Sequence, residues 1–280
     1  MAVASQVVID TDPGVDDFLA LVLALRSAEL RVEALTTVGG NCPLRLATRN
    51  ALRVLEYTGR EEVPVYAGAA RPARGSFRYA PYFHGPSGLT VRMPRPRTAP
   101  AAGPAVDALA RLLGTRRAGP FTVIALGPLT NIARLLQDKP AAARKIGQLV
   151  VMGGAVESRG NVRPGQYAEF NIWNDPEAAA VVLRSGLPVR LIGLDVCNLV
   201  RLRPGDVRQA APLIRRMMEN WFALRPRGDR FSMSDPLAVA AVIAPRLFLF
   251  KSMPLHVVTE GEQRGRRVAA ADGPPVEVAV

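Results

Sequence analysis

Four carboxylates lie within eight positions near the start of the chain: Asp10, Asp12, Asp16 and Asp17. They fall between an apolar run that is typical of a buried strand and an amphipathic pattern that is typical of a helix. Like charges this close repel one another, and burial makes the repulsion more costly. A bound cation offsets that cost, and carboxylate oxygens in a turn are ligands that calcium and magnesium prefer. Helix capping explains only Asp16 and Asp17, so the cluster predicts a metal or catalytic site.

The cluster belongs to a chain in which short β-branched runs alternate with helical patterns. Strands are expected at residues 6–10, 31–38, 121–126, 147–152 and 189–194. Helices are expected at residues 16–26, 43–57, 128–136, 175–184 and 235–243. This alternation is typical of a parallel sheet with helices on both faces. No flexible linker or repeat divides the chain, so we predict one α/β domain over residues 1–280, with a mostly parallel central sheet in a Rossmann-like arrangement.

Further polar residues follow the ends of the expected strands. In an open parallel sheet, the site lies beyond the carboxyl ends of the strands. The residues at those positions, or at the start of a late helix that reaches the same edge, are Asn41, Thr130, Asn131, Met152, Asp195 and Asp235. We therefore expect them to converge with the acidic cluster on one edge of the sheet.

Two segments break the alternation. Residues 71–104 are rich in proline, arginine and glycine, and residues 225–234 are polar and contain glycine. A long irregular insertion in a compact α/β domain is more often functional than accidental. Both segments are therefore interpreted as lids over the site.

The net charge of +12 raises the question of nucleic-acid binding. The excess is almost all arginine and is scattered along the chain, and aromatic residues are sparse, so no stacking module is indicated. No secretory leader or membrane span is visible. Two cysteines, Cys42 and Cys197, are too few for a disulfide framework, which indicates a protein of the reducing cytoplasm. The sequence alone still allows a single disulfide between them.

The motifs of this chain resemble those of the inosine-uridine preferring nucleoside hydrolases. The resemblance covers nearly the whole length in family order. It rests on the acidic stretch at 10–17 and on Thr37–Asn41, His84–Gly88, Ala125–Asn131, Val151–Gly154, Ala168–Asn171 with Asp175–Glu177, and Ser234–Val239. It implies hydrolysis of the N-glycosidic bond of ribonucleosides, with Ca2+ as cofactor, a small-molecule ribonucleoside as substrate, and a homodimer or homotetramer as the assembly.

The resemblance also implies roles for individual residues. Calcium would be bound by Asp12, Asp17, Thr130 (through its carbonyl) and Asp235. The ribose hydroxyls would be held by Asp16, Asn171, Asn41, Asn161 and Glu169, with Met152 lining the sugar pocket. Asp12 would also be the general base on a calcium-bound water, and Asp10 would orient the loop. Such a site suits an oxocarbenium-like transition state, because carboxylates stabilise developing positive charge.

One position departs from the family pattern. Many members carry a histidine immediately before the aspartate that matches Asp235, where it is placed to protonate the leaving base. Here that residue is Ser234, whose hydroxyl is far too weak an acid for this task. The alternative base contacts are His84, Tyr167 and Trp221, together with Tyr79 and Tyr82. His256, in an expected strand, is interpreted as structural.

Two rival functions remain open from the sequence. Asp10 and Asp12 have the spacing of a haloacid dehalogenase-type phosphohydrolase, but Pro13 and Gly14 replace the expected hydroxyl-bearing pattern. The second rival is a homologue that binds ribose or nucleosides but has lost turnover, and only Ser234 supports it.

Overall fold

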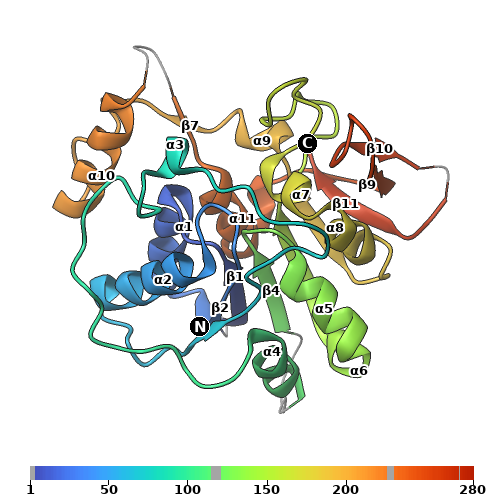
Figure 1. Ribbon diagram of the computed structural model, residues 1–280, viewed down its shortest axis with the longest axis horizontal. Coiled ribbons are helices and arrows are strands. Elements are labelled where there is room, and N and C mark those ends of the chain that lie inside the picture. The colour runs from blue at the N-terminus through green and yellow to red at the C-terminus, as the bar shows by residue number, and fades with distance from the viewer. Residues whose placement is uncertain (1–3, 115–120, 226–229, 271) are drawn as a thin grey trace.

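A nine-stranded sheet forms the centre of the computed structural model, which describes residues 4–114, 121–225, 230–270 and 272–280 (Figure 1). Its order is β10-β9-β11-β6-β5-β4-β1-β2-β3. The strands are β1 (Ser5–Thr11), β2 (Leu30–Thr37), β3 (Val65–Ala67), β4 (Phe121–Ala125), β5 (Ile146–Met152), β6 (Val189–Ile192), β9 (Phe250–Val257), β10 (Arg267–Ala269) and β11 (Pro275–Ala279). Neighbours from β11 to β3 are parallel, whereas β9 and β10 are antiparallel at one edge. The predicted mostly parallel sheet is confirmed.

The strand order reverses direction at β1, which determines where a site can form. From β1 the chain builds outward through β2 and β3 on one side, then returns to place β4, β5 and β6 on the other. The connections therefore diverge beyond the carboxyl ends of β1 and β4 and leave a crevice there. Asp12 directly follows β1, so the acidic cluster lies at this switch point.

Helices cover both faces of the sheet, as Figure 1 shows. On one face lie α1 (Val15–Arg26), α2 (Leu44–Thr58) and α11 (Ser234–Ile243), and on the other α4 (Ala105–Gly114), α5 (Thr130–Asp138), α6 (Pro140–Ala143) and α8 (Pro176–Leu183). Each face has its own apolar cluster, because β1 sends Val7 and Ile9 to one side and Val8 to the other. All three side chains are fully buried, as expected for a parallel strand covered on both faces.

The remaining elements of the described ranges are further helices, a 3-10 turn and a small two-stranded sheet. They are α3 (Pro81–His84), α7 (Phe170–Asn174), α9 (Leu194–Cys197), α10 (Pro212–Ala223), the 3-10 turn Pro245–Leu247, and the small sheet of β7 (Arg201–Leu202) and β8 (Phe231–Ser232). Apart from α3, residues 71–104 contain no regular element, as predicted. Of the predicted segment 225–234, residues 226–229 lie outside the described residues. No helix in the described ranges is both long and apolar enough to cross a membrane.

Candidate active site

The floor of the site is the turn between β1 and α1, and Asp17 organises it. The Asp17 carboxylate accepts hydrogen bonds from the Thr11 hydroxyl at 2.5 Å and from the backbone amide of Gly14 at 2.9 Å. It also accepts from the Asn41 side-chain amide at 2.9 Å. Because Asp17 lies in the first turn of α1, the helix N-terminus further favours its negative charge. The side chain is fully buried and held from several directions.

Asp12 lies beside Asp17 with one oxygen free. Its Oδ2 accepts the backbone amide of Asn41 at 2.6 Å, whereas its buried Oδ1 has no hydrogen-bond partner among the residues that the structure describes. Two glycines make room for this carboxylate. A Cβ on Gly40 would lie 2.0 Å from Oδ2, and one on Gly127 would lie 2.7 Å from Oδ1. The glycines that follow β2 and β4 are therefore required for close approach to Asp12.

Asp10 supports the floor from beneath. Its Oδ1 accepts hydrogen bonds from the Thr36 hydroxyl at 2.5 Å and from the Asn131 amide at 2.7 Å. Burial raises the pKa of Asp10 to about 7, although both hydrogen bonds lower it. Asn131 also accepts the Ala69 backbone amide at 2.9 Å. Asp10 thus ties β1 to β2 and to the start of α5.

The carboxylates have the composition and spacing of a cation site. Ligand oxygens of Asp16, Asp17 and Asp235 all lie within 4.8 Å of one another. Burial, followed by repulsion from Asp17, raises the pKa of Asp16 to about 8, and burial with the neighbouring carboxylates raises the pKa of Asp12 and Asp235. A divalent cation among these carboxylates would reverse the shifts by favouring their charged forms. The residues therefore fit a hard metal ion such as calcium.

The clustered set differs in part from the expected ligands. Asp17 and Asp235 belong to both sets, and the third clustered carboxylate is Asp16, which was expected to contact ribose. Thr130 is buried at the start of α5, and its hydroxyl donates to Asp175 at 2.6 Å. This contact involves the hydroxyl of Thr130 and not its backbone carbonyl, which is the group expected to bind calcium.

A cavity of about 450 Å³ opens above this floor. Its volume is within the usual range for small-molecule sites. The predicted residues among its lining are Asp16, Asn41, His84, Met152, Asn161, Glu169, Asn171, Ser234 and Asp235. Asp12 and Asp17 lie in the buried turn beneath it. Segments that are far apart in the sequence are thus brought together at the switch point.

Glu169 and Asn171 form one polar side of the cavity. The Glu169 carboxylate caps α7 by accepting the amides of Asn171 at 2.8 Å and Ile172 at 3.1 Å, and it also accepts the Gly154 amide at 2.9 Å. The Asn171 side-chain amide donates to the Leu126 carbonyl at 2.6 Å. These contacts fix both side chains in place before any ligand binds.

A buried arginine lies behind Glu169. Arg267 of β10 is 2% exposed, and its guanidinium nitrogens have no hydrogen-bond partner among the described residues. A Cβ on Gly154 would lie 1.7 Å from the Arg267 Cζ, so the two residues are in direct contact. Burial lowers the pKa of Arg267 to about 10, although Glu169 and Asp195 raise it. The arginine thus adds positive charge behind a carboxylate that faces the cavity.

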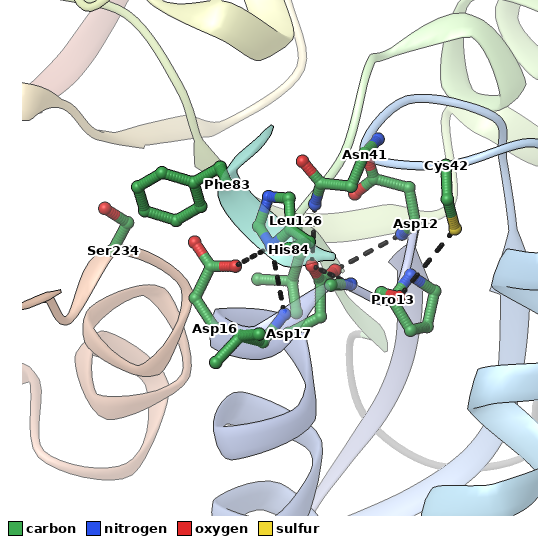
Figure 2. A network of polar contacts seen from close by, with 12 residues as sticks. Asp12, Pro13, Asp16, Asp17, Asn41, Cys42, Phe83, His84, Leu126 and Ser234 are labelled. Atoms are coloured by element: carbon green, nitrogen blue, oxygen red, sulfur yellow. Dashed lines mark hydrogen bonds and ion pairs between the residues drawn. The ribbon is translucent and has the colours of Figure 1, made fainter. Parts of the chain in front are cut away.

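His84 reaches the site from α3. Its Nδ1 accepts the backbone amide of Val15 at 3.1 Å and lies 3.7 Å from Asp16 (Figure 2). An accepting Nδ1 carries no proton, so the neutral ring holds its hydrogen on Nε2. Burial, with a smaller contribution from Arg225, lowers the pKa of His84 to about 3. Gly14 allows this approach, because a Cβ there would lie 2.4 Å from Nδ1.

Comparison with known proteins identifies the family of the chain. The model of the inosine-uridine preferring nucleoside hydrolases matches residues 7–280. The chain belongs to this family. It is 36% identical to the pyrimidine-specific ribonucleoside hydrolase RihA of Salmonella paratyphi B, over 92% of this chain and 86% of the relative. It is 39% identical to the non-specific ribonucleoside hydrolase RihC of Salmonella paratyphi C, over 94% and 86%.

A solved structure shares the fold along nearly the whole chain. The purine-preferring ribonucleoside hydrolase from Gardnerella vaginalis superposes with a TM-score of 0.91 at 31% identity, covering 99% of this chain and 93% of that one. The resemblance that the motifs indicated is confirmed. The relatives differ in the base that their names state, so membership of the family leaves the base open.

Three of the predicted base contacts of this family member, Tyr79, Tyr167 and Trp221, do not line the cavity. Trp221 is 2% exposed and packs edge-on against Phe83, at 5.3 Å between ring centroids, because α10 buries that face in the core. Tyr167 is 38% exposed and also does not line the cavity. His256 is exposed on β9 and takes no part in the lining.

Several lining residues were missed in the sequence. They include Phe83 of α3, Arg159, Arg163 and Gln166 beside Asn161, and Asn198 and Ser232 near Ser234, whereas Tyr82 was among the alternative base contacts and does line the cavity. Proximity to Asn161 and Ser234 was the signal for most of them. Phe83 adjoins the predicted His84 but had no signal of its own.

Proposed function

We propose that this protein hydrolyses the N-glycosidic bond of ribonucleosides and releases the free base and ribose. The observation that carries the proposal is the buried carboxylate cluster at the floor of a cavity of nucleoside size. A cluster of this kind suits a reaction in which positive charge develops on the sugar, because fixed negative charge stabilises it. The family membership of the chain supports the same reaction.

The sugar would lie on the floor. Asp16 and Asn171 would hold the ribose 2′-hydroxyl, and Asn41, Asn161 and Glu169 the other hydroxyls, with Met152 as an apolar wall. Each of these residues lines the cavity. Asp16 has a buried oxygen without a partner, so it is free to accept a hydroxyl hydrogen. Buried polar groups that need a hydroxyl partner reject sugars without one.

Calcium would be held by Asp12, Asp17, Asp235 and the Thr130 carbonyl. When bound, it would organise the 2′- and 3′-hydroxyls and make water easier to deprotonate. Asp12 is the proposed general base, because its Oδ1 has no competing donor. The water oxygen bonds to C1′ as the C1′–N bond breaks, its proton passes to Asp12, and the bonding electron pair leaves with the base.

Departure of the base needs a different explanation from that in relatives with a histidine before the metal-binding aspartate. The Ser234 hydroxyl lies 3.5 Å from the Ser232 hydroxyl and is no useful acid near neutral pH. Neutral His84 is able to donate a hydrogen bond from Nε2 but holds no second proton to transfer. We infer that these groups orient the base, and that bases able to leave without full protonation are cleaved fastest.

Substrate class, cellular location and assembly complete the proposal. The substrate is a small-molecule ribonucleoside, with no nucleic-acid or membrane partner. The protein acts in the cytoplasm, where Cys42 and Cys197 stay as the free, buried thiols seen here. Assembly into a homodimer or homotetramer is proposed from the resemblance.

The test is ribose release from a panel of nucleosides, comprising inosine, adenosine, guanosine, uridine, cytidine and a riboside with an activated leaving group. Release from natural nucleosides supports the proposal and shows the base preference. Release from the activated riboside alone means that Ser234 has removed leaving-group activation for natural bases. Binding without any release favours the homologue that has lost turnover.

A further inference from the structure

Arg225 joins α3, which lines the cavity, to α10, which packs behind α3. It lies two positions after the end of α10 at Ala223, and its guanidinium carbon lies 3.8 Å from the centroid of the Trp221 ring and 4.7 Å from that of Phe83. Phe83 belongs to α3, more than a hundred positions earlier in the chain. Cation–π contacts of this kind are strongest where water is excluded, and Trp221 is 2% exposed.

Hydrogen bonds from the same guanidinium connect the two helices. One nitrogen donates to the Trp221 carbonyl at 3.1 Å. Another donates to the carbonyls of Tyr82 at 3.2 Å and Phe83 at 2.8 Å. Carbonyls in the last turn of a helix lack partners within the helix and carry partial negative charge. Arg225 therefore stabilises the C-terminal ends of α10 and α3 together.

The α3 helix depends on such contacts for its position. It has only four residues, Pro81–His84, and an isolated helix of that length is not stable in water. From below, His84 ties it to Val15 at the start of α1. From above, Phe83 packs against Trp221 and Phe231, with ring centroids 5.3 and 6.2 Å away. Arg225 covers this aromatic group from the α10 side.

The wall that α3 forms lies over the base side of the proposed site. Tyr82, Phe83 and His84 all line the cavity, and Figure 2 shows the Phe83 ring beside His84. The proposed ribose-binding groups come from other elements, namely the start of α1, the turn after β2, the loop around Asn161 and the start of α7. The planar base is the part of a nucleoside that aromatic side chains recognise.

We propose that Arg225 is a positioning residue that holds α3 against α10 and thereby sets the affinity of the site for the base, but not for the sugar. The inference rests on the proposed function, because it assumes that a nucleoside occupies the cavity. Arg225 itself acts through Tyr82, Phe83 and His84.

The test compares Arg225→Met and Arg225→Lys with a matched control. Methionine keeps much of the length of the side chain but removes the charge and the donors, and lysine keeps the charge without the planar fork. Arg53→Met is the control, because Arg53 joins α2 to the same irregular segment by donating to the carbonyls of Pro94 and Met93, both at 2.9 Å. Arg53 does not line the cavity.

The readouts separate base binding from sugar binding. Arg225→Met should raise KM for inosine and uridine about tenfold, while the inhibition constant of free ribose stays within about twofold. Arg225→Lys should fall between Arg225→Met and the wild type, and Arg53→Met should match the wild type in both quantities. Thermal unfolding of each variant shows that the comparison is made on folded protein.

Two outcomes would overturn the inference: an unchanged KM in Arg225→Met, or a loss of ribose inhibition in the same proportion as the loss of nucleoside affinity. If the wild type releases no ribose, the proposed hydrolysis fails by itself. The role of Arg225 is then tested by calorimetric dissociation constants for inosine, uridine and ribose, with the same expected ratios. Absence of nucleoside binding to the wild type would overturn both.

Discussion

The floor and the upper wall of the cavity are built in different ways. The floor consists of a single turn and its immediate supports, and the Asp12 and Asp17 side chains are fully buried in it. The wall consists of α3, with α10 packed behind it, and of the loop around Asn161, and in it Tyr82 is 73% exposed and Asn161 also reaches solvent. From this difference we expect the chemistry to depend on the buried floor and base recognition to depend on α3 in the exposed wall. Substitutions in the floor should therefore affect turnover, and those in the wall affinity.

The largest effect is expected for Asp12→Asn. The substitution keeps the shape of the side chain but removes the proposed general base, and we expect kcat to fall about 10³-fold with KM changed little. The measurement is the initial rate of ribose release at saturating nucleoside. Asp138→Asn, at an exposed position on α5, is the matched control. A fall in kcat of less than about tenfold would show that Asp12 is not the general base.

The second prediction concerns the sugar. Asp16 and Asn171 would be left without a hydroxyl partner by a 2′-deoxyribonucleoside, so we expect kcat/KM to be at least about 10²-fold lower than for the ribose counterpart. Thymidine and 5-methyluridine are the matched pair, because they carry the same base. Comparable turnover of the two would contradict the proposed sugar contacts.

A smaller effect is expected for Asp195→Ala, which acts on the wall. The Asp195 carboxylate accepts the amides of Val156, Glu157 and Ser158 at 3.0, 2.8 and 2.8 Å, and thereby anchors the loop that carries Asn161. Loss of this anchor should raise KM about fivefold, leave kcat nearly unchanged and cost about 1–3 kcal/mol of stability. Steady-state kinetics and thermal unfolding give these quantities.

The pH dependence of that stability gives a second check. Burial raises the pKa of Asp195, but the hydrogen bonds from the three amides together outweigh burial, so the pKa lies below its ordinary value. A lowered pKa means that the stabilisation is present above the pKa of the unfolded chain and is lost as the pH falls through that of the folded protein. The variant and the wild type should therefore converge in acid. Asp206→Ala is the control, because in the described part of the chain the Asp206 carboxylate accepts only the Arg203 amide, in an exposed turn.

The smallest expected effect is a difference in the rate at which the two thiols react. Cys42 lies behind the floor, with its Sγ 3.9 Å from the Pro13 carbonyl, and Cys197 lies behind the wall, 4.0 Å from the Ser234 carbonyl. Burial raises the pKa of both, to about 12 for Cys197, so neither should react in the folded protein at pH 8. On slow labelling followed by mass spectrometry, Cys197 should react before Cys42. The reverse order would show that the floor opens first.

The floor could be predicted from the sequence because its parts are local. Four carboxylates between a strand and a helix leave few physical explanations, and the ends of parallel strands meet at one edge. Asp16, Asn41 and Asp235 therefore lie together as expected. Asp12 and Asp17 lie directly beneath them in the same turn.

The wall could not be predicted in the same way because its contacts join distant segments. Trp221 was expected to contact the base, but helical periodicity does not reveal that its ring packs between Phe83 and Phe231. Arg225 was one of many scattered arginines, and only the folded chain places it over Trp221. The antiparallel edge strand β10 and its buried Arg267 gave no periodic signal.

The central claim is that the carboxylate floor binds calcium and that this complex cleaves ribonucleosides. The most direct test is ribose release from inosine and uridine by protein stripped with a chelator, before and after titration with Ca2+. We predict negligible release from the stripped protein and recovery that saturates at one calcium per chain. Full activity of the stripped protein, or no activity at any calcium concentration, would contradict the account.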